Sequence, residues 1–122
     1  MRFTQDTSPN VNVIRGYGPG ELRINDEVFR TTMIVAATAT RSAPSITNAA
    51  ELDAAHAALL LELQPEVVLI GTGQRQVFPA PAFGVQFLKV GIGFEAMDTG
   101  AACRTFNVLV SEQRLVVALL IV

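Results

Sequence analysis

The chain ends in its most apolar stretch, the eight residues from Leu115 to Val122. A helix that crosses a membrane needs about 20 apolar residues, so this run is too short to span a bilayer. Its length and its β-branched residues are typical of a buried strand. A buried strand must be covered by other elements, so this run predicts a layered fold with the strand in its core.

Composition supplies the material for one such core and excludes several functions. Half of the 122 residues are hydrophobic and 16% are charged, whereas disordered chains combine low hydrophobicity with high net charge. A chain of this length seldom divides into two cores, so residues 1–122 are expected to form a single domain. The net charge of -2 indicates no basic surface for nucleic acid.

The chain has one cysteine, Cys103, and one histidine, His56. A single cysteine cannot form an internal disulfide, which favours a reducing compartment. These two side chains also provide too few ligands for a soft-metal site. Residues 1–10 are polar and lack the apolar run of a secretory signal. We therefore expect a cytoplasmic protein with no membrane insertion, no metal and no cofactor.

The first third of the chain is predicted to be mostly β. Its apolar residues alternate with polar ones between clusters rich in Gly, Pro, Asn, Ser and Thr, a pattern typical of strands joined by turns. The expected elements are a strand at 11–14, a turn at 16–20, a hairpin of strands 21–24 and 27–29, a strand at 32–38 and a loop at 40–48.

The rest of the chain is expected to alternate helices and strands, which indicates α/β layers. Asn48 and Glu51 form a variant capping box at the start of a helix that Pro65 ends. The later elements are a strand at 66–70, a turn at 71–73, either a helix or a strand at 82–90, a strand at 94–97, a helix capped by Asp98 or Thr99 with Ala102, Phe106, Leu109 and Val110 on its buried face, and a strand at 114–122.

Gly71, Thr72 and Gly73 follow a predicted buried strand, a position at which α/β folds tend to bind ligands. Glycines there let the backbone approach a phosphate, and a following helix N-terminus favours an anion. However, Gln76 stands where a dinucleotide fingerprint needs its third glycine, and the chain contains no P-loop sequence. A sharp turn is therefore predicted, with a nucleotide site as the weaker alternative.

The start of the last predicted helix carries the most chemically capable residues. On a helix, Cys103, Arg104 and Asn107 share the side away from the stripe of Ala102 and Phe106. The dipole and free N–H groups of a helix start stabilise a thiolate or a bound anion. Arg104 adds a guanidinium that binds a carboxylate or a phosphate with two hydrogen bonds.

No residue is expected to be catalytic. A nucleophilic cysteine needs a base, and His56 is the only histidine. His56 falls among the leucines of its helix, where a hydrogen-bonded histidine is more common than a catalytic one. In the structural alternative for the helix start, Cys103 packs as an inert thiol and Arg104 pairs with an acid such as Glu112.

Several short motifs match one signature block. They are Gly91-Ile92-Gly93, Met97-Asp98-Thr99, Ala101 to Asn107, Leu109, Glu112 and Arg114, with Gly71-Thr72-Gly73-Gln74 and Tyr17-Gly18-Pro19-Gly20 outside the block. In these residues the chain resembles a family of small proteins related to mitochondrial complex I assembly factor 3. The same family contains the adipogenesis-associated Mth-type domain proteins and many uncharacterised bacterial and archaeal proteins. The likeness covers most of the chain.

The resemblance implies a three-layer β/β/α domain with a mixed sheet, the Mth-type fold. For the mitochondrial members it implies a protein–protein role in assembling respiratory complex I, without a known reaction. Some bacterial members are associated with protein-export genes. The implied partner is therefore a respiratory or translocase subunit.

The first predicted function is a non-enzymatic protein-interaction or assembly factor, for respiratory complex I or another membrane complex. The alternative is a small-molecule or anion-binding protein, with or without an enzyme activity, and it predicts a concave pocket that Arg104 and Cys103 face. A third hypothesis is self-association through the C-terminal strand or the Phe-rich segment. The expected contact residues of the first two functions are Gly71, Thr72, Gly73, Asp98, Thr99, Arg104 and Asn107.

Overall fold

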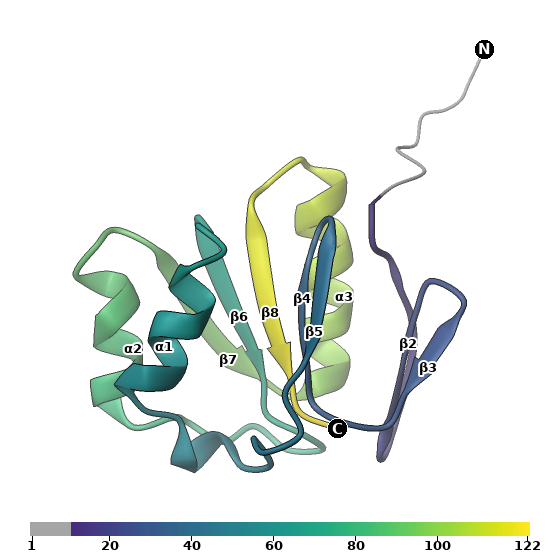
Figure 1. Cartoon of the computed structure of the whole chain (residues 1–122), viewed down its shortest axis with the longest axis horizontal. Helices are drawn as coiled ribbons and strands as arrows, with labels where there is room; N and C mark the ends of the chain where they lie inside the picture. Colours follow the sequence, from purple (N-terminus) through teal and green to yellow (C-terminus); the bar gives the residue numbers. More distant parts are fainter. Residues whose placement is uncertain (1–10) are drawn as a thin grey trace.

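A computed structural model describes residues 11–122, and the polar N-terminal residues considered above lie outside that range. The elements alternate much as the hydrophobic pattern predicts (Figure 1). They are β1 (Ile14–Gly18), β2 (Glu21–Ile24), β3 (Glu27–Phe29), β4 (Met33–Ala36), β5 (Ala39–Ser42), a 3-10 turn (Ala49–Glu51), α1 (Ala54–Leu61), β6 (Val67–Gly71), α2 (Pro81–Leu88), β7 (Gly93–Met97), α3 (Thr99–Ser111) and β8 (Val116–Leu120).

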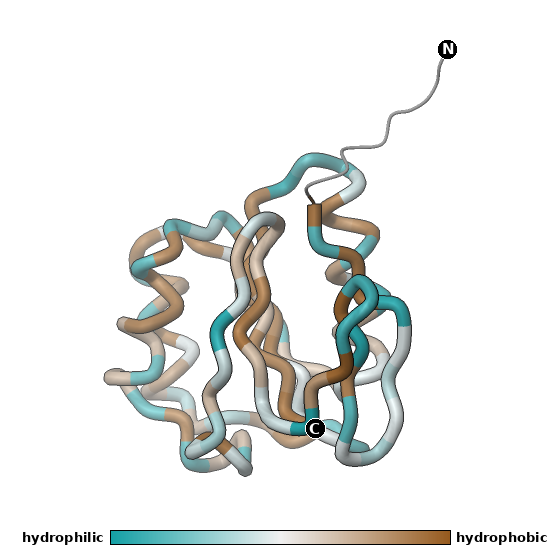
Figure 2. The backbone as a smooth tube through the Cα atoms, turned by 45° about the vertical axis from the view of Figure 1, so that its right-hand side comes forward, coloured by the Kyte–Doolittle hydropathy of each residue, from teal (hydrophilic) through white to brown (hydrophobic). Residues whose placement is uncertain are grey.

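The central element is a five-stranded mixed sheet in the order β5-β4-β8-β6-β7. β8 is buried along its whole length and pairs with β6 in parallel and with β4 in antiparallel orientation. β6 also pairs in parallel with β7. The predicted buried C-terminal strand is therefore confirmed, and the hydrophobic strands run through the middle of the molecule (Figure 2).

Helices and a second sheet cover the two faces of the central sheet. α1 and α2 pack on one face, whereas α3 packs on the other face together with the three-stranded sheet β1-β2-β3 (Figure 1). α3 contacts β6 and β8 on one side and β1 on the other. This arrangement confirms the predicted α/β fold in three layers.

Each face of the sheet has its own hydrophobic core. The core under α1 and α2 contains an aromatic cluster in which Phe83 lies edge-on to Phe87 and Phe94, with ring centroids 5.2 and 5.7 Å apart. Phe87 and Phe94 stack at 5.5 Å. Because Phe83 and Phe87 lie one helical turn apart and are both fully buried, segment 82–90 is a helix rather than a strand over most of its length.

Two predictions for the first half of the chain are wrong. Both segments form strands through backbone pairing, although their side chains give little sign of a strand. Residues 40–42 were expected to be part of a loop, but they belong to the edge strand β5, whose side chains are all exposed. Similarly, the glycines at 16 and 18 belong to β1 rather than to a turn. Polar or small side chains lower the strand signal without preventing a backbone ladder.

The long helix predicted between Asn48 and Pro65 is also wrong. Asn48 caps only a 3-10 turn, because Leu52 is extended (φ -69°, ψ 134°). α1 then starts at the capping box of Asp53, whose carboxylate accepts the N–H of His56 at 3.1 Å. The Nδ1 atom of His56 accepts the N–H of Asp53 at 3.1 Å, so the only histidine is a half-buried capping residue.

Candidate functional site

The turn after β6 and the start of α3 lie in direct contact, as the location of both at strand ends suggests. Gly73 N–H donates to Thr99 Oγ1 at 2.8 Å, and Thr99 N–H donates to the carbonyl of Gly73 at 2.8 Å. Thr99 Oγ1 in turn donates to the carbonyl of Ile121 at 2.6 Å. One fully buried threonine therefore joins β6, α3 and the C-terminal segment.

Internal hydrogen bonds already use the N–H groups that a bound anion would need. Thr72 N–H donates to the carbonyl of Met97 at 2.8 Å, and Thr72 Oγ1 accepts the N–H of Val77 at 3.0 Å. At the helix start, Asp98 Oδ1 accepts the N–H of Ala101 at 2.9 Å. The Gly71–Gly73 turn thus presents no cluster of free N–H groups to a phosphate, and a carboxylate already occupies the helix N-terminus.

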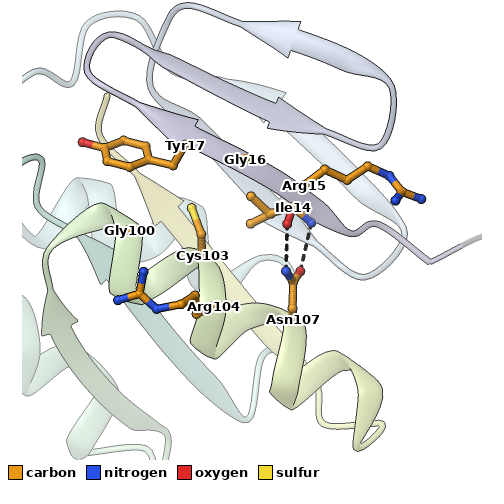
Figure 3. Close-up of a pocket in the computed structure, with 8 residues that line it drawn as sticks. All are labelled: Ile14, Arg15, Gly16, Tyr17, Gly100, Cys103, Arg104 and Asn107. Carbon is orange, nitrogen blue, oxygen red and sulfur yellow. Dashed lines mark hydrogen bonds between the residues drawn. The ribbon is translucent and has the colours of Figure 1, made fainter.

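A cavity of about 250 Å³ lies next to this region, between β1 and α3 (Figure 3). The alternative function predicted a concave pocket faced by Arg104 and Cys103, and both residues line this one. Residues of the Gly71–Gly73 turn do not line it. The lining residues are Ile14, Arg15, Gly16, Tyr17, Gly100, Cys103, Arg104 and Asn107.

Asn107 holds the two walls of the cavity together. Its Oδ1 accepts the N–H of Ile14 at 2.9 Å, and its Nδ2 donates to the carbonyl of Ile14 at 2.8 Å (Figure 3). The two residues are 93 positions apart, so no local pattern could have indicated the contact. Both hydrogen-bonding groups of the Asn107 amide are engaged within the protein.

Cys103 is buried in the core between α3 and the sheets, together with Ala102 and Phe106. The expectation that Cys103 lies away from the buried stripe is therefore wrong, because β1 also packs on α3. The structural alternative, in which Cys103 packs in the core, describes its position. Burial raises the pKa of the thiol from 9.0 to about 12, with Asp98 adding to the shift and Arg104 opposing it. His56 lies on the opposite face of the central sheet, too far away to serve as its base.

This buried thiol predicts a loss of stability in alkali. The folded protein keeps the proton in the pH range in which the unfolded chain releases it, so stability is full below about pH 9 and falls as pH rises above it. The free energy of unfolding falls by at most about 1.4 kcal/mol per pH unit. Urea unfolding from pH 7 to pH 10 measures it, with Cys103→Ala as the control; equal slopes in the two proteins would contradict the assignment.

Tyr17 lies over the first turn of α3 (Figure 3). Among residues 11–122 its hydroxyl is the one buried side-chain polar atom without a hydrogen-bond partner. Burial is the main cause that raises the pKa of this phenol, and the nearby Cys103 and Asp98 add to the shift, whereas Thr99 opposes it. Tyr17 is therefore a neutral hydroxyl at physiological pH.

Arg104 is exposed on α3 at the mouth of the cavity. Within residues 11–122 the arginine–carboxylate ion pairs are Arg30 with Glu21 and Arg114 with Glu66. Arg104 takes part in neither, so its predicted pairing with an acid such as Glu112 does not occur. In the same range, His, Cys, Asp and Glu side chains form no group that could hold a metal ion.

A second surface feature is an apolar patch on α2 and the loop before it. We define this α2 patch by four exposed residues: Phe78 is 75% exposed, Leu88 62%, Val90 57% and Val85 47%. Between residues 72 and 94 the only charged side chains are Arg75 and Lys89. The patch is thus an apolar surface with basic groups and no acidic ones along the same segment. From the sequence, the Phe-rich segment was expected to mediate only self-association.

None of the helices in residues 11–122 combines the length and the apolar character needed to cross a membrane. A family model described as "Protein of unknown function (DUF498/DUF598)" matches residues 14–121. The chain is 31% identical over 106 residues to the "13 kDa major membrane protein" of Francisella tularensis, with 86% of each chain covered.

Two further comparisons concern function and fold. NADH dehydrogenase (ubiquinone) 1 alpha subcomplex assembly factor 3 of Danio rerio is 47% identical over 62 residues, a match that spans 51% of this chain and 36% of the relative. The solution structure of a Bordetella pertussis protein described as a Mth938-like domain has a TM-score of 0.79 and 30% identity, and the match covers 99% of this chain and 92% of that one.

Proposed function

The chain belongs to the DUF498/DUF598 family of proteins with the Mth938-like fold, as its resemblance to Mth-type proteins predicted, and on that premise we propose that it is an assembly factor that binds a protein partner through the α2 patch. Relatives named as assembly factors support a role through protein partners. The match to them spans about a third of their length, so it does not by itself assign their partners to this chain.

The observation that carries the proposal is the exposure of the α2 patch. A solvated helix normally presents charged or polar side chains opposite its buried face. α2 instead buries Phe83 and Phe87 and leaves Val85 and Leu88 in solvent. Several large apolar residues exposed within one short segment of a folded protein favour an interaction surface there. Arg75 and Lys89, the two charged side chains of the same segment, favour a partner with acidic groups beside its apolar centre.

The finer proposal is that this partner is a respiratory or translocase subunit of a membrane complex, met in the cytoplasm. The name of the Danio rerio relative points to complex I, and that of the Francisella tularensis relative points to a membrane. Of the contact residues expected from the sequence, Thr99 and Asn107 use their side chains internally, and the turn is bonded to α3. Arg104 retains a free charged group, which the next subsection considers separately.

Replacing Leu88 with aspartate is expected to abolish partner binding without unfolding the protein. Leu88 is exposed, so the change adds a charge to the α2 patch while the core is preserved. The measurement is capture from a native lysate by the tagged protein, followed by mass spectrometry and by binding to the purified partner. A membrane-complex subunit should be retained by the wild type and reduced at least about tenfold by Leu88→Asp.

The matched control is Val108→Asp. Val108 is 53% exposed and lies in the last turn of α3, as Leu88 lies in the last turn of α2. Both variants therefore add one negative charge near a helix C-terminus, and only one changes the patch. Equal capture by the two variants, or a folded wild type that retains no such subunit, would contradict the proposal.

A further inference from the structure

We propose that the cavity between β1 and α3 binds a carboxylate group, held by the guanidinium of Arg104 and by the hydroxyl of Tyr17. This site is separate from the α2 patch and goes beyond the proposed role in assembly. Its ligand is a small carboxylic acid or a carboxylate side chain of another protein.

The charge of the cavity favours an anion. Its lining contains two arginines, Arg15 and Arg104, and no acidic residue. The side chain of Arg15 points away from the other lining residues, whereas that of Arg104 points along the first turns of α3 toward Gly100 (Figure 3). The Nη1 atom of Arg104 lies 3.6 Å from the point that a Cβ on Gly100 would occupy. A guanidinium that forms no ion pair with residues 11–122 is thus positioned at the cavity.

The surroundings favour a single negative charge over a double one. Asp98 Oδ1 lies 3.4 Å from the same point at Gly100, so a phosphate dianion there would meet a like charge. Cys103 is a neutral thiol and adds no charge. A carboxylate carries one charge, and its two oxygens match the planar fork of a guanidinium.

The buried hydroxyl of Tyr17 is a second sign of a ligand. Thr99 Oγ1 is a polar neighbour of this hydroxyl, but it already accepts the N–H of Gly73 and donates to the carbonyl of Ile121. A buried hydroxyl without a partner destabilises the folded state, and such groups are rare in folded proteins. The ring edge reaches Gly100, since its Cδ2 atom lies 3.6 Å from the virtual Cβ. A carboxylate bound beside Arg104 is the acceptor that this hydroxyl lacks. Because the oxygen is closed to solvent, we expect the Tyr17 ring to shift when the ligand binds.

A glycine on α3 keeps the cavity open. Gly100 lines it from α3, whereas Gly16 lines it with its backbone, because a Cβ on Gly16 would point toward the Cβ of Arg23 on β2, 3.9 Å away. A Cβ on Gly100 would lie at ordinary contact distance from Asp98, Tyr17 and Arg104, so alanine fits the fold but fills the space between these side chains. The volume of about 250 Å³ lies below the usual range of about 300–1,000 Å³ for drug-sized ligands. The ligand group is therefore small.

The test is a titration of the ¹⁵N-labelled protein followed by NMR. The probes are sodium propionate, sodium phosphate and sodium chloride at matched ionic strength. We expect propionate to produce saturable shifts of the Gly16 and Gly100 amides and of the Arg104 Nε–H, with no comparable shifts in chloride and weaker binding of phosphate. Shifts that do not saturate, or that chloride reproduces, would overturn the proposal.

Variants then assign the binding to this site. Arg104→Gln and Gly100→Ala should each weaken propionate binding at least about tenfold with an unchanged melting temperature, and Tyr17→Phe should weaken it several-fold. Arg23→Gln removes the same charge from an exposed side chain of β2 that does not line the cavity, and this variant should bind as the wild type does. Equal weakening by Arg23→Gln and Arg104→Gln would show only a general effect of charge and would overturn the site.

A further arm distinguishes the two sources of the carboxylate. The peptide Gly-Glu-Gly, acetylated and amidated at its ends, presents one glutamate carboxylate and no terminal charge. Tighter binding of this peptide than of propionate would assign the site to a side chain of a partner protein. Tighter binding of propionate would assign it to a free small acid.

Discussion

Alanine at position 71 is expected to lower the free energy of unfolding by about 3 kcal/mol. A Cβ on Gly71 would lie 2.9 Å from Thr99 Oγ1, 3.0 Å from Thr99 Cα and 3.1 Å from Leu120 Cδ2. One of these neighbours is backbone, so the clash can be relieved only by moving α3 away from β6. That movement also strains the bonds of Thr99 to Gly73 and to Ile121. Urea unfolding measures the loss.

Gly93→Ala is the matched control for this prediction. Gly93 is also in a parallel strand of the same sheet, but a Cβ there would meet its nearest neighbours at 3.6 and 3.7 Å. We expect its stability to stay within about 0.5 kcal/mol of the wild type. A Gly71→Ala protein as stable as Gly93→Ala would show that the turn is more plastic than its contacts indicate.

This role of Gly71 also shows what the sequence motif meant. Glycine after a buried strand suggested room for a phosphate, but the space beside it is filled by Thr99 and Leu120 of the chain itself. The sharp turn that was predicted there describes the geometry. The close approach of two backbones and the close approach of a ligand both require glycine, so the motif alone could not separate them.

Hydrophobic periodicity was sufficient for the elements that bury side chains. β6 and β8 are continuous apolar runs, and the hairpin of β2 and β3 turns at Asn25, which adopts a left-handed φ of 55°. The pattern failed where side chains carry little of the energy, as in the exposed strand β5. The pattern failed again at Leu52, because a continuous helix would also have buried this side chain. In the structure Leu52 is buried but extended, and it interrupts the helix before α1 begins.

The cavity could be predicted only in part, because its two walls come from distant segments. Arg104 and Cys103 were identified from the helix start, whereas Tyr17 and Gly16 belong to a segment that was predicted to be a turn. The resemblance had already singled out Tyr17 as part of a motif. Its position opposite Gly100 depends on how β1 packs on α3, and one side-chain amide fixes that packing.

Replacing Asn107 with alanine is therefore expected to release β1 from α3 and to lower the free energy of unfolding by about 2–3 kcal/mol. The change removes two hydrogen bonds and leaves the N–H and the carbonyl of Ile14 without partners next to a hydrophobic core. Hydrogen exchange should show faster exchange of the Ile14 amide, and propionate binding should be lost with the cavity wall.

Two comparisons separate this clamp from a general effect of truncation on α3. Val108→Ala shortens the neighbouring exposed side chain and should change stability by no more than about 0.5 kcal/mol. Asn107→Asp keeps an oxygen for the Ile14 N–H but turns a second oxygen toward the Ile14 carbonyl, which repels it. Its stability should therefore be below that of the wild type and should recover partly at acidic pH, when the carboxyl becomes a donor. An Asn107→Asp protein as stable as the wild type at neutral pH would mean that only one of the two bonds holds β1 in place.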